Sequence, residues 1–536
     1  MPLRPRLLEC AHSFPAARKE ALGATVARDS PSECVKNFAN IQKTLNASHG
    51  PRYGRPSHRF GPPTAIFSEP LALLKYRLDH PESLTPDPFT LEHTFNLISA
   101  SAGTFDDEKQ RETTLKFTLQ ALLPGQGNWQ QKTVGGSSIP DAAWLEGPFT
   151  YLIFQLKNEG GFGGDPFLQS LLAYGKVIAQ QTVCSLSFLH PTFPPLNHTI
   201  QYNPVRQRSN FPVILVAIAG NILVVSAAIF TNEIYANKLF STDLDLGSHG
   251  SDNVFRVARV FMAIQSAIGQ LRGLYRHLPG APPAQNAIAL WPRPTGDPPE
   301  STERLPKLEY FAKVNRADGT PLPWINEENE NHAMYLARMQ IKTSTPAEAP
   351  TEAEAPTRSK ASAQAEASAQ DVFVKFATKY HADAHRLLAG QVPPLAPALH
   401  FCAPVVGDMY MIVMEYIPKS AGQSIHSYSF TNYPSGLLQA VEQDVSKALR
   451  LLHERNWVFG DLRAPNMLYL PGSDGGRVLL VDFDGVGVDG EGRYSACLNP
   501  AAGFCASVER GGVMRKEHDL ENLEKLSKQL RNSSMT

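Results

Sequence analysis

The sequence predicts two mixed domains, an α/β domain followed by an α+β domain, and three observations support this expectation. The 536 residues are too many for one ordinary domain, since a domain usually takes about 150 residues. Apolar runs of strand length alternate with amphipathic stretches of helical period in both halves of the chain. A proline-rich linker over residues 281–304 separates the halves, which places the domains at residues 86–280 and 305–530.

Charge and cysteine usage narrow the class of protein. Lys and Arg number 50 and Asp and Glu number 51, so no global positive field predicts a nucleic-acid partner, although a local patch remains compatible with one. No two of the six cysteines have CxxC spacing, so we expect neither a zinc site nor a disulfide framework. The N-terminal stretch holds no apolar run long enough for a signal peptide. We therefore expect an intracellular protein, cytoplasmic or nuclear.

One uncharged segment, residues 211–230, is long enough to cross a bilayer. Its middle reads Ala219-Gly220-Asn221, a turn signal between two runs rich in Val and Ile, each of strand length. The segment therefore predicts a buried β-hairpin rather than a membrane helix, and we expect no membrane partner.

The first domain has a mixed pattern after an irregular start. Residues 1–85 are rich in Pro, His, Arg and Ser and lack periodicity, so we expect them to be poorly ordered or loosely packed. The elements predicted after them are a helix over 106–123, a strand within 143–159, a helix over 165–181, the hairpin, and a long helix over 252–278.

The second domain carries one interruption. Residues 343–370 are a low-complexity Ala/Glu/Pro/Ser stretch that cannot form a packed core, so they predict a flexible insertion. The elements predicted around it are strands over 308–315, 332–340 and 371–376, a helix over 379–389, a strand over 409–418, a helix over 437–456, and a strand leading to residue 485.

The stretch NWVFGDLRAPNMLYL, residues 456–470, holds the polar residues that point to chemistry. Phosphoryl transfer needs a Lys on the phosphates, an Asp that takes the acceptor proton, and an Asn and a second Asp that hold Mg²⁺. The second domain supplies Lys375, Asp461, Asn466 and Asp482 in that order, each beside an apolar strand or helix. This ordered set predicts a phosphotransferase that uses ATP and Mg²⁺.

The motifs VFGDLRAPN, VLLVDFDG, GRYSACLN and KEHDLENLEKL resemble the fungal-type protein kinase family, a divergent kinase-like domain of mushroom-forming fungi. The resemblance implies a bilobal protein-kinase-like fold. It also implies that Asp461 is the catalytic base and that Arg463 replaces the loop Lys that contacts the γ-phosphate. By the same resemblance, Asn466 and Asp482 would bind Mg²⁺, and Lys375 would bind the α- and β-phosphates.

The resemblance assigns supporting roles as well. Glu415 would lie at the adenine edge, and Asp519 would brace the catalytic loop. Asp383 stands where the family has the helix Glu that pairs with Lys375. Because its side chain is one methylene shorter than that of Glu, we expect a weaker or water-bridged ion pair.

Three departures from the general kinase pattern are visible. Phe459 replaces the usual His, at a position that mainly packs. The metal motif reads DFD in place of DFG, with Gly485 directly after it. The first two strands of the domain lack a GxGxxG loop to cover the phosphates.

A second constellation lies in the first domain. Asp141, preceded by a Pro, and Gln155-x-Lys157 on an apolar strand resemble the PD-(D/E)XK nuclease pattern and imply a restriction-endonuclease-like α/β fold. A nuclease-like module followed by a kinase-like module resembles the Crinkler-type effector architecture. The acids of that pattern hold Mg²⁺, and its Lys orients the attacking water. Gln155 offers an oxygen without charge, so metal binding should be weaker. Glu159 would supply a compensating carboxylate, since residues two apart on a strand face the same side.

The function expected from these patterns is that of a protein Ser/Thr kinase acting on a protein hydroxyl. Three alternatives stay open. They are a small-molecule phosphotransferase of the aminoglycoside or choline kinase type, a non-catalytic pseudokinase scaffold, and a nuclease regulated by the kinase fold, which would make nucleic acid a partner.

Overall fold

The computed structural model describes most of the chain outside several connecting segments. The described residues are 21–25, 27–47, 50–54, 61–125, 141–146, 149–157, 165–184, 209–231, 233–247, 249–278, 291–301, 304–314, 321–322, 333–340, 369–428, 433–434, 436–472, 475–499 and 502–533.

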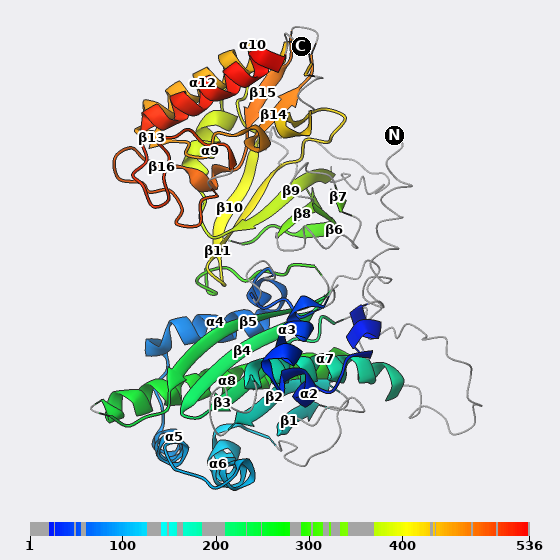
Figure 1. Ribbon diagram of the computed structural model, residues 1–536, viewed down its shortest axis with the longest axis vertical. Helices are drawn as coiled ribbons and strands as arrows, with labels where there is room; N and C mark the ends of the chain where they lie inside the picture. The colour runs from blue at the N-terminus through cyan, green and yellow to red at the C-terminus, as the bar shows by residue number, and fades with distance from the viewer. Residues whose placement is uncertain are drawn as a thin grey trace, which may run out of the picture. The chain divides into compact units, whose positions relative to one another are not determined.

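The chain forms two compact units, and both mix helices with β-sheets (Figure 1). Unit 1 comprises Met1–Glu303 with Pro323–Ala333 and Pro404–Met409. Unit 2 comprises Arg304–Leu322, Met334–Ala403 and Tyr410–Thr536. The mixed α/β class expected from the sequence is therefore confirmed, and each unit is described by itself below.

Unit 1 is built on a five-stranded sheet with strand order β1-β2-β3-β4-β5. Strands β2 and β3 are parallel, and the other neighbours are antiparallel. A parallel pair needs a long crossover, and helix α7 lies in the connection between these two strands. The strands are β1 (Ala142–Glu146), β2 (Phe149–Lys157), β3 (Val213–Ala219), β4 (Ile222–Phe230) and β5 (Ile234–Asp243).

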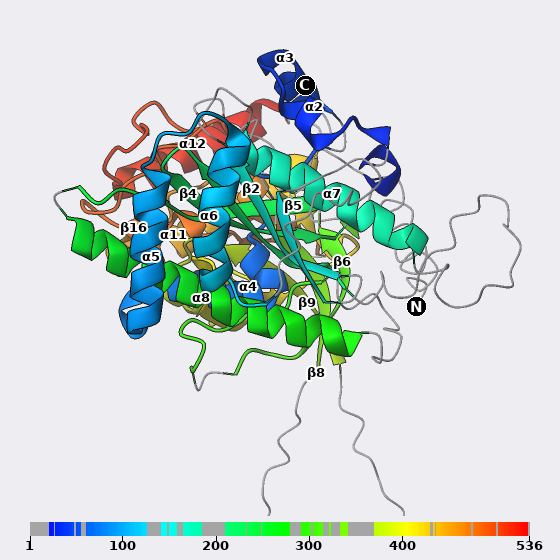
Figure 2. The ribbon, with the colours of Figure 1, turned by 90° about the horizontal axis from the view of Figure 1, so that it is seen from below.

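Helices cover both faces of this sheet, which is why β2 is buried from Phe149 to Leu156 without alternation. Helix α7 packs on β2 and β3, helix α8 packs on β1 and β2, and Figure 2 shows the two helices on opposite sides of the sheet. The helices described in this unit are α2 (Pro31–Val35), α3 (Phe38–Asn46), α4 (Glu69–Asp79), α5 (Pro88–Ser101), α6 (Glu108–Leu122), α7 (Pro166–Cys184) and α8 (Gly250–His277), with 3-10 turns at Thr64–Phe67 and Pro81–Ser83.

The predicted hairpin is confirmed. Strands β3 and β4 pair antiparallel from Val213↔Ala228 to Ala219↔Ile222, and Gly220 takes a φ of +57° in the turn between them. Among the helices of the described part of the chain, none combines the length and apolar character that a bilayer crossing requires. The stretch over residues 143–159 holds two antiparallel strands, β1 and β2, where the sequence predicts one.

Residues 1–85 are expected to be poorly ordered or loosely packed, but the described residues between 21 and 85 include well-packed helices. Val35 of α2 belongs to a buried cluster with Leu168 of α7, and Leu71 and Leu74 of α4 are fully buried. The helix α4 also packs against α8. These helices are short and lie between proline-rich stretches, so their apolar residues find partners only in the tertiary structure.

Unit 2 begins with a six-stranded sheet of order β10-β11-β9-β8-β6-β7. Helix α9 (Ala382–Ala389) lies between β9 and β10 in the chain. The sheet's strands are β6 (Leu308–Val314), β7 (Pro321–Leu322), β8 (Met334–Gln340), β9 (Ala369–Ala377), β10 (Leu399–Val405) and β11 (Met409–Glu415). The predicted insertion falls between β8 and β9, and residues 341–368 lie outside the described residues.

The rest of unit 2 combines helices with two small sheets of order β12-β14-β15 and β13-β16. One buried cluster joins α9, β11, α11, α12 and the loops that carry Phe459 and Phe483, so a single core lies beneath these loops. The remaining elements are β12 (Gln423–Ser424), α10 (Leu437–Ala440), a π-helical turn (Val441–Val445), α11 (Ser446–His453), β13 (Trp457–Val458), β14 (Met467–Leu470), β15 (Arg477–Leu480), β16 (Gly487–Val488) and α12 (Lys516–Ser533), with 3-10 turns at Ile425–Ser427, Ala464–Asn466 and Phe483–Gly485.

Candidate functional site

The loop between β13 and β14 carries Asp461, and its second residue is a glycine that no other residue can replace without strain. Gly460 has a φ of +75°, and a Cβ there would lie 2.2 Å from Met514 Cε and 2.6 Å from the Gly485 carbonyl oxygen. The close approach holds the Asp461 loop against the turn that ends at Gly485.

A buried carboxylate supports the same loop from α12. Asp519 is fully buried and accepts hydrogen bonds from the backbone N–H groups of Phe459 (2.7 Å) and Gly460 (3.0 Å). Its Oδ2 also lies 3.0 Å from His453 Nε2. These hydrogen bonds tie α12 to the loop, which is the bracing contact expected of Asp519.

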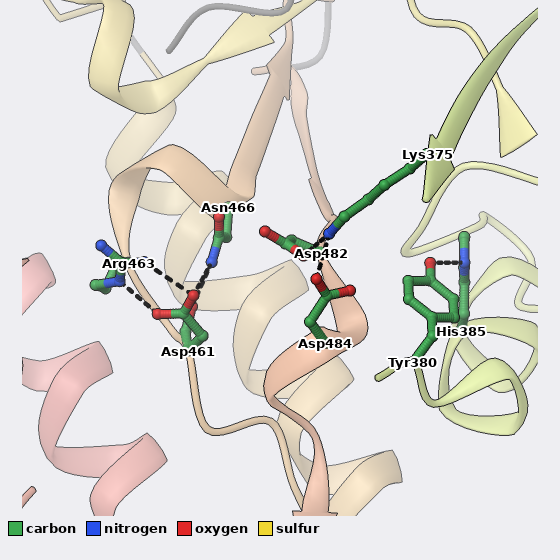
Figure 3. A network of polar contacts seen from close by, with 8 residues as sticks. All are labelled: Lys375, Tyr380, His385, Asp461, Arg463, Asn466, Asp482 and Asp484. Carbon is green, nitrogen blue, oxygen red and sulfur yellow. Dashed lines mark hydrogen bonds and ion pairs between the residues drawn. The ribbon is translucent and has the colours of Figure 1, made fainter. Parts of the chain in front are cut away.

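Asp461 is held by two neighbours of its own loop (Figure 3). Arg463 donates from Nε to Oδ1 and from Nη2 to Oδ2, the latter at 2.8 Å. Asn466 Nδ2 donates to Oδ2 of Asp461 at 2.8 Å and to its backbone carbonyl at 2.9 Å. The hydrogen bonds with Asp461 raise the pKa of Arg463, and the guanidinium carbon lies 5.1 Å from the centre of the Phe504 ring.

The turn after β15 brings two more carboxylates to the site. Asp482 takes a φ of +71°, a left-handed conformation that residues other than glycine seldom adopt and that is found often at functional sites. The preceding residue, Val481, donates its N–H to the Asn466 carbonyl at 3.0 Å. The Asp461 loop and the Asp482 turn are therefore joined by a hydrogen bond between their backbones.

Lys375 reaches this turn from β9 and contacts both carboxylates (Figure 3). Its Nζ donates to Asp482 Oδ1 and, at 2.5 Å, to Asp484 Oδ2. Burial lowers the pKa of Lys375, but the two negative charges outweigh it, so the pKa lies above its ordinary value. Burial also raises the pKa of Asp484 to about 7, against the opposing charge of Lys375.

Two features of this cluster depart from the sequence-based expectation. Asp383 does not pair with Lys375; its side chain is 74% exposed and accepts a hydrogen bond from Arg386 at 3.1 Å. This prediction is wrong, because the buried face of α9 carries Ala384, His385 and Leu388, and position 383 lies outside it. Asp484 contacts Lys375 instead. In the sequence this residue stands out only because it replaces the glycine of the DFG motif.

His385 is a further site residue that sequence reasoning misses. Its ring stacks on Phe483 with centroids 4.5 Å apart and planes 8° apart. Nδ1 lies 2.7 Å from the Tyr380 hydroxyl, and Nε2 lies 2.8 Å from the Pro397 carbonyl (Figure 3 shows the first contact). Burial lowers the pKa of His385 to about 4, so the ring is neutral at pH 7. The one signal in the sequence is a His amid the apolar positions of a predicted helix.

Two other predicted residues of unit 2 have structural contacts. Glu415 ends β11. Its Oε2 accepts from the Ala398 N–H at 3.1 Å, and its backbone N–H donates to the Ala398 carbonyl at 2.8 Å. Phe459 is fully buried and packs edge to face on Phe483 with centroids 5.6 Å apart. Phe459 therefore fills the packing role expected of its position.

In unit 1 the structure brings Asp141 and Gln155 together. Asp141 Oδ2 accepts from Gln155 Nε2 at 2.7 Å and from the Leu156 N–H at 2.6 Å. Gln155 is 1% exposed, and its Oε1 has no hydrogen-bond partner. Lys157 follows two residues later at the end of β2, opposite Ala219 of β3, while the predicted Glu159 lies outside the described residues.

The helix that follows this motif carries another buried amide. Gln169 of α7 donates from Nε2 to Ser32 Oγ at 3.2 Å, and its Oε1 is buried without a partner. In the part of the chain that the structure describes, no group of three or more His, Cys, Asp or Glu side chains is arranged to hold a metal. A metal in either unit would therefore need amide or ligand oxygens beside the carboxylates.

Neither a model of a known protein family nor a curated protein matches this chain. The functional argument therefore rests on the geometry of the two sites.

Proposed function

We propose that unit 2 is a phosphotransferase that uses Mg-ATP, and specifically a protein Ser/Thr kinase of the fungal type. The observation that carries the proposal is a continuous chain of contacts. Lys375 bonds to Asp482, Val481 bonds to Asn466, and Asn466 bonds to Asp461. These residues come from three separate parts of unit 2, and together they comprise the groups that phosphoryl transfer requires.

The donor atoms fit Mg²⁺ and a nucleotide. In proteins, Mg²⁺ usually binds to one or two carboxylates together with the phosphates of the substrate. Here Asp482 would supply the carboxylate, and the amide oxygen of Asn466 would be a further ligand. The buried Oδ1 of Asp484 has no hydrogen-bond partner, so the acidic turn retains unused acceptor capacity. Lys375 would neutralise phosphate charge, and Mg²⁺ would supply further neutralisation of the charge on the transferred group.

The catalytic role falls to Asp461. Arg463 and Asn466 fix both carboxylate oxygens, and Oδ1, which accepts one of these three hydrogen bonds, keeps a further lone pair for an incoming hydroxyl. Asp461 would orient that hydroxyl and take its proton at a carboxylate oxygen, while Arg463 places positive charge beside it. The acceptor we propose is the Ser or Thr hydroxyl of a protein in the cytoplasm or nucleus.

The first test is thermal stabilisation by Mg-ATP in wild type and in Asp482→Ala, followed by γ-phosphate release. We expect Mg-ATP to raise the Tm of wild type by several degrees and to leave the Tm of Asp482→Ala unchanged. We also expect wild type to release γ-phosphate and Asp461→Ala to release none. Absence of stabilisation in wild type would contradict the proposal. Stabilisation without turnover would support the scaffold alternative, and turnover restricted to small hydroxylated acceptors would support the aminoglycoside or choline kinase type.

We propose metal-dependent nuclease activity as a second candidate function, located in unit 1. The Asp141–Gln155 hydrogen bond and the unpartnered, buried Oε1 of Gln155 favour it, since a buried amide oxygen without a donor is costly unless a ligand fills it. The test is cleavage of single- and double-stranded DNA and RNA with Mg²⁺ or Mn²⁺. Cleavage that Asp141→Ala and Lys157→Ala both abolish is expected, and cleavage unaffected by either change would exclude this site.

A further inference from the structure

Lys375 needs a counter-charge. Its side chain is only 13% exposed, and a buried ammonium without a carboxylate is strongly destabilising. Two carboxylates contact it, from Asp482 and Asp484. If Asp482 serves the metal, as the proposed function requires, a different group must keep Lys375 neutralised and oriented.

Helix α9 cannot supply that group. Asp383 is the only acidic residue between Ala382 and Ala389, and its exposed carboxylate pairs with Arg386 of the same helix. The buried positions of α9 hold Ala384, His385 and Leu388, none of which carries a negative charge.

The helix is nonetheless fixed to the acidic turn by other contacts. His385 stacks on Phe483, and the His381 N–H donates to the Phe483 carbonyl at 3.2 Å. The ion pair that would otherwise tie this helix to Lys375 is therefore not needed to position it.

We propose that Asp484 is the fixed partner of Lys375, taking the place of a helix-borne carboxylate, and that this leaves Asp482 available to the metal. The inference rests on the proposed function. Asp484 Oδ2 lies 2.5 Å from Lys375 Nζ, within the turn that Phe483 anchors to α9. Asp482, in contrast, directly follows the residue bonded to Asn466, the other metal-binding candidate. Asp484 is thus a positioning residue, and this role accounts for the second Asp of the DFD motif.

The test compares Asp484→Asn with the matched control Asp383→Asn in the full-length protein. The readouts are the Kd for a non-hydrolysable ATP analogue with Mg²⁺ and the kcat and KM for ATP. We expect Asp484→Asn to weaken analogue binding and raise KM by about tenfold or more, with a smaller change in kcat, because Lys375 holds the ground-state phosphates too. Asp484→Glu should recover part of the affinity, and Asp383→Asn should match wild type.

A second measurement, of stability without nucleotide, covers the case in which Asp484→Asn folds poorly. If Asp484 neutralises Lys375, the double variant Lys375→Met/Asp484→Asn should lose less stability than the sum of the losses in the two single variants. Wild-type affinity in Asp484→Asn, an equal loss in Asp383→Asn, or strictly additive losses of stability in the double variant would overturn the assignment while leaving the proposed function intact. Failure of wild type to bind the analogue with Mg²⁺ would instead overturn the proposed function and this inference with it.

Discussion

Single buried polar residues organise the site in unit 2, and the groups around each residue satisfy its polar atoms. Asp519 accepts hydrogen bonds from two backbone N–H groups, so its carboxylate is satisfied inside the core. His385 is packed between Phe483 and a backbone carbonyl, so it stays neutral. Asp519 holds the loop backbone and His385 holds the Phe483 ring. Their contributions can therefore be measured as changes in the free energy of unfolding.

The neutral state of His385 predicts a pH dependence of stability. Burial lowers its pKa from 6.5 to about 4, so between these values the unfolded chain binds a proton that the folded chain does not. The stability contributed by neutral His385 is therefore complete above about pH 6.5 and is lost as the pH falls towards 4, by up to about 3 kcal/mol. Urea denaturation across this pH range should show that the free energy of unfolding falls less steeply in His385→Gln than in wild type.

The control for this pH series is His426→Gln, because His426 is exposed. It should keep the wild-type slope. A His385→Gln slope identical to that of wild type would show that the buried ring does not titrate as inferred.

Removal of the Asp519 carboxylate should be costly in a different way. Asp519→Ala leaves the N–H groups of Phe459 and Gly460 without their acceptor in the core, at about 1–3 kcal/mol for each group. Glu524→Ala on the same helix is the matched control, since Glu524 is 66% exposed and forms an exposed ion pair with Lys528, so we expect a change within about 0.5 kcal/mol. Chemical denaturation of both variants measures the difference, and equal losses would argue against the bracing role.

Among the elements, the sheet of unit 2 shows how local pairing sets the position of Lys375. Lys375 lies opposite Ile412 of β11 and Met334 of β8, so antiparallel neighbours on both sides fix its place along β9. A slip of one residue would turn its side chain to the other face of the sheet. The register of β8 and β9 is therefore part of the site.

That register predicts the effect of removing the segment between these strands. Gln340 at the end of β8 pairs with Ala369 at the start of β9, so the ends of the segment 341–368 are adjacent. Replacement of this segment by Asn-Gly should preserve the hairpin and leave the free energy of unfolding equal or higher, because a shorter loop costs less closure entropy. Urea denaturation and Mg-ATP stabilisation would check it, and loss of the nucleotide response would show that the segment itself contributes to the site.

At the scale of the whole molecule, the two candidate sites lie in separate units. Asp141, Gln155 and Lys157 belong to unit 1, whereas Lys375, Asp461, Asn466 and Asp482 belong to unit 2. The two sets share no residue, so each proposed activity can be removed without changing a side chain of the other site.

This separation predicts reciprocal variants. Asp482→Ala should abolish stabilisation by Mg-ATP and leave any metal-dependent cleavage of nucleic acid at its wild-type rate. Asp141→Ala should do the reverse, with an unchanged Kd for the nucleotide analogue. Measured on the same preparations, loss of both activities in either variant would contradict the assignment of one site to each unit.

The sequence by itself determined the elements whose pattern is local. The hairpin over 211–230, the helix over 252–278 and the strand around Lys375 follow from apolar periodicity and turn residues, which act over a few neighbours. The order of Lys375, Asp461 and Asp482 along the chain was equally readable. Their chemistry depends on residue type and order, so these candidates could be named without coordinates.

Only the tertiary structure decided which groups meet. A motif comparison assigns Asp383 to Lys375 by its place in the chain, but the face on which a helix residue lies depends on what the helix packs against, and α9 turns Asp383 to solvent. The contacts of Asp484 with Lys375 and of His385 with Phe483 join residues about a hundred positions apart. Packing decides which residues so far apart in the chain are buried together and which charges meet. The partner of Lys375 therefore could not be read from the sequence.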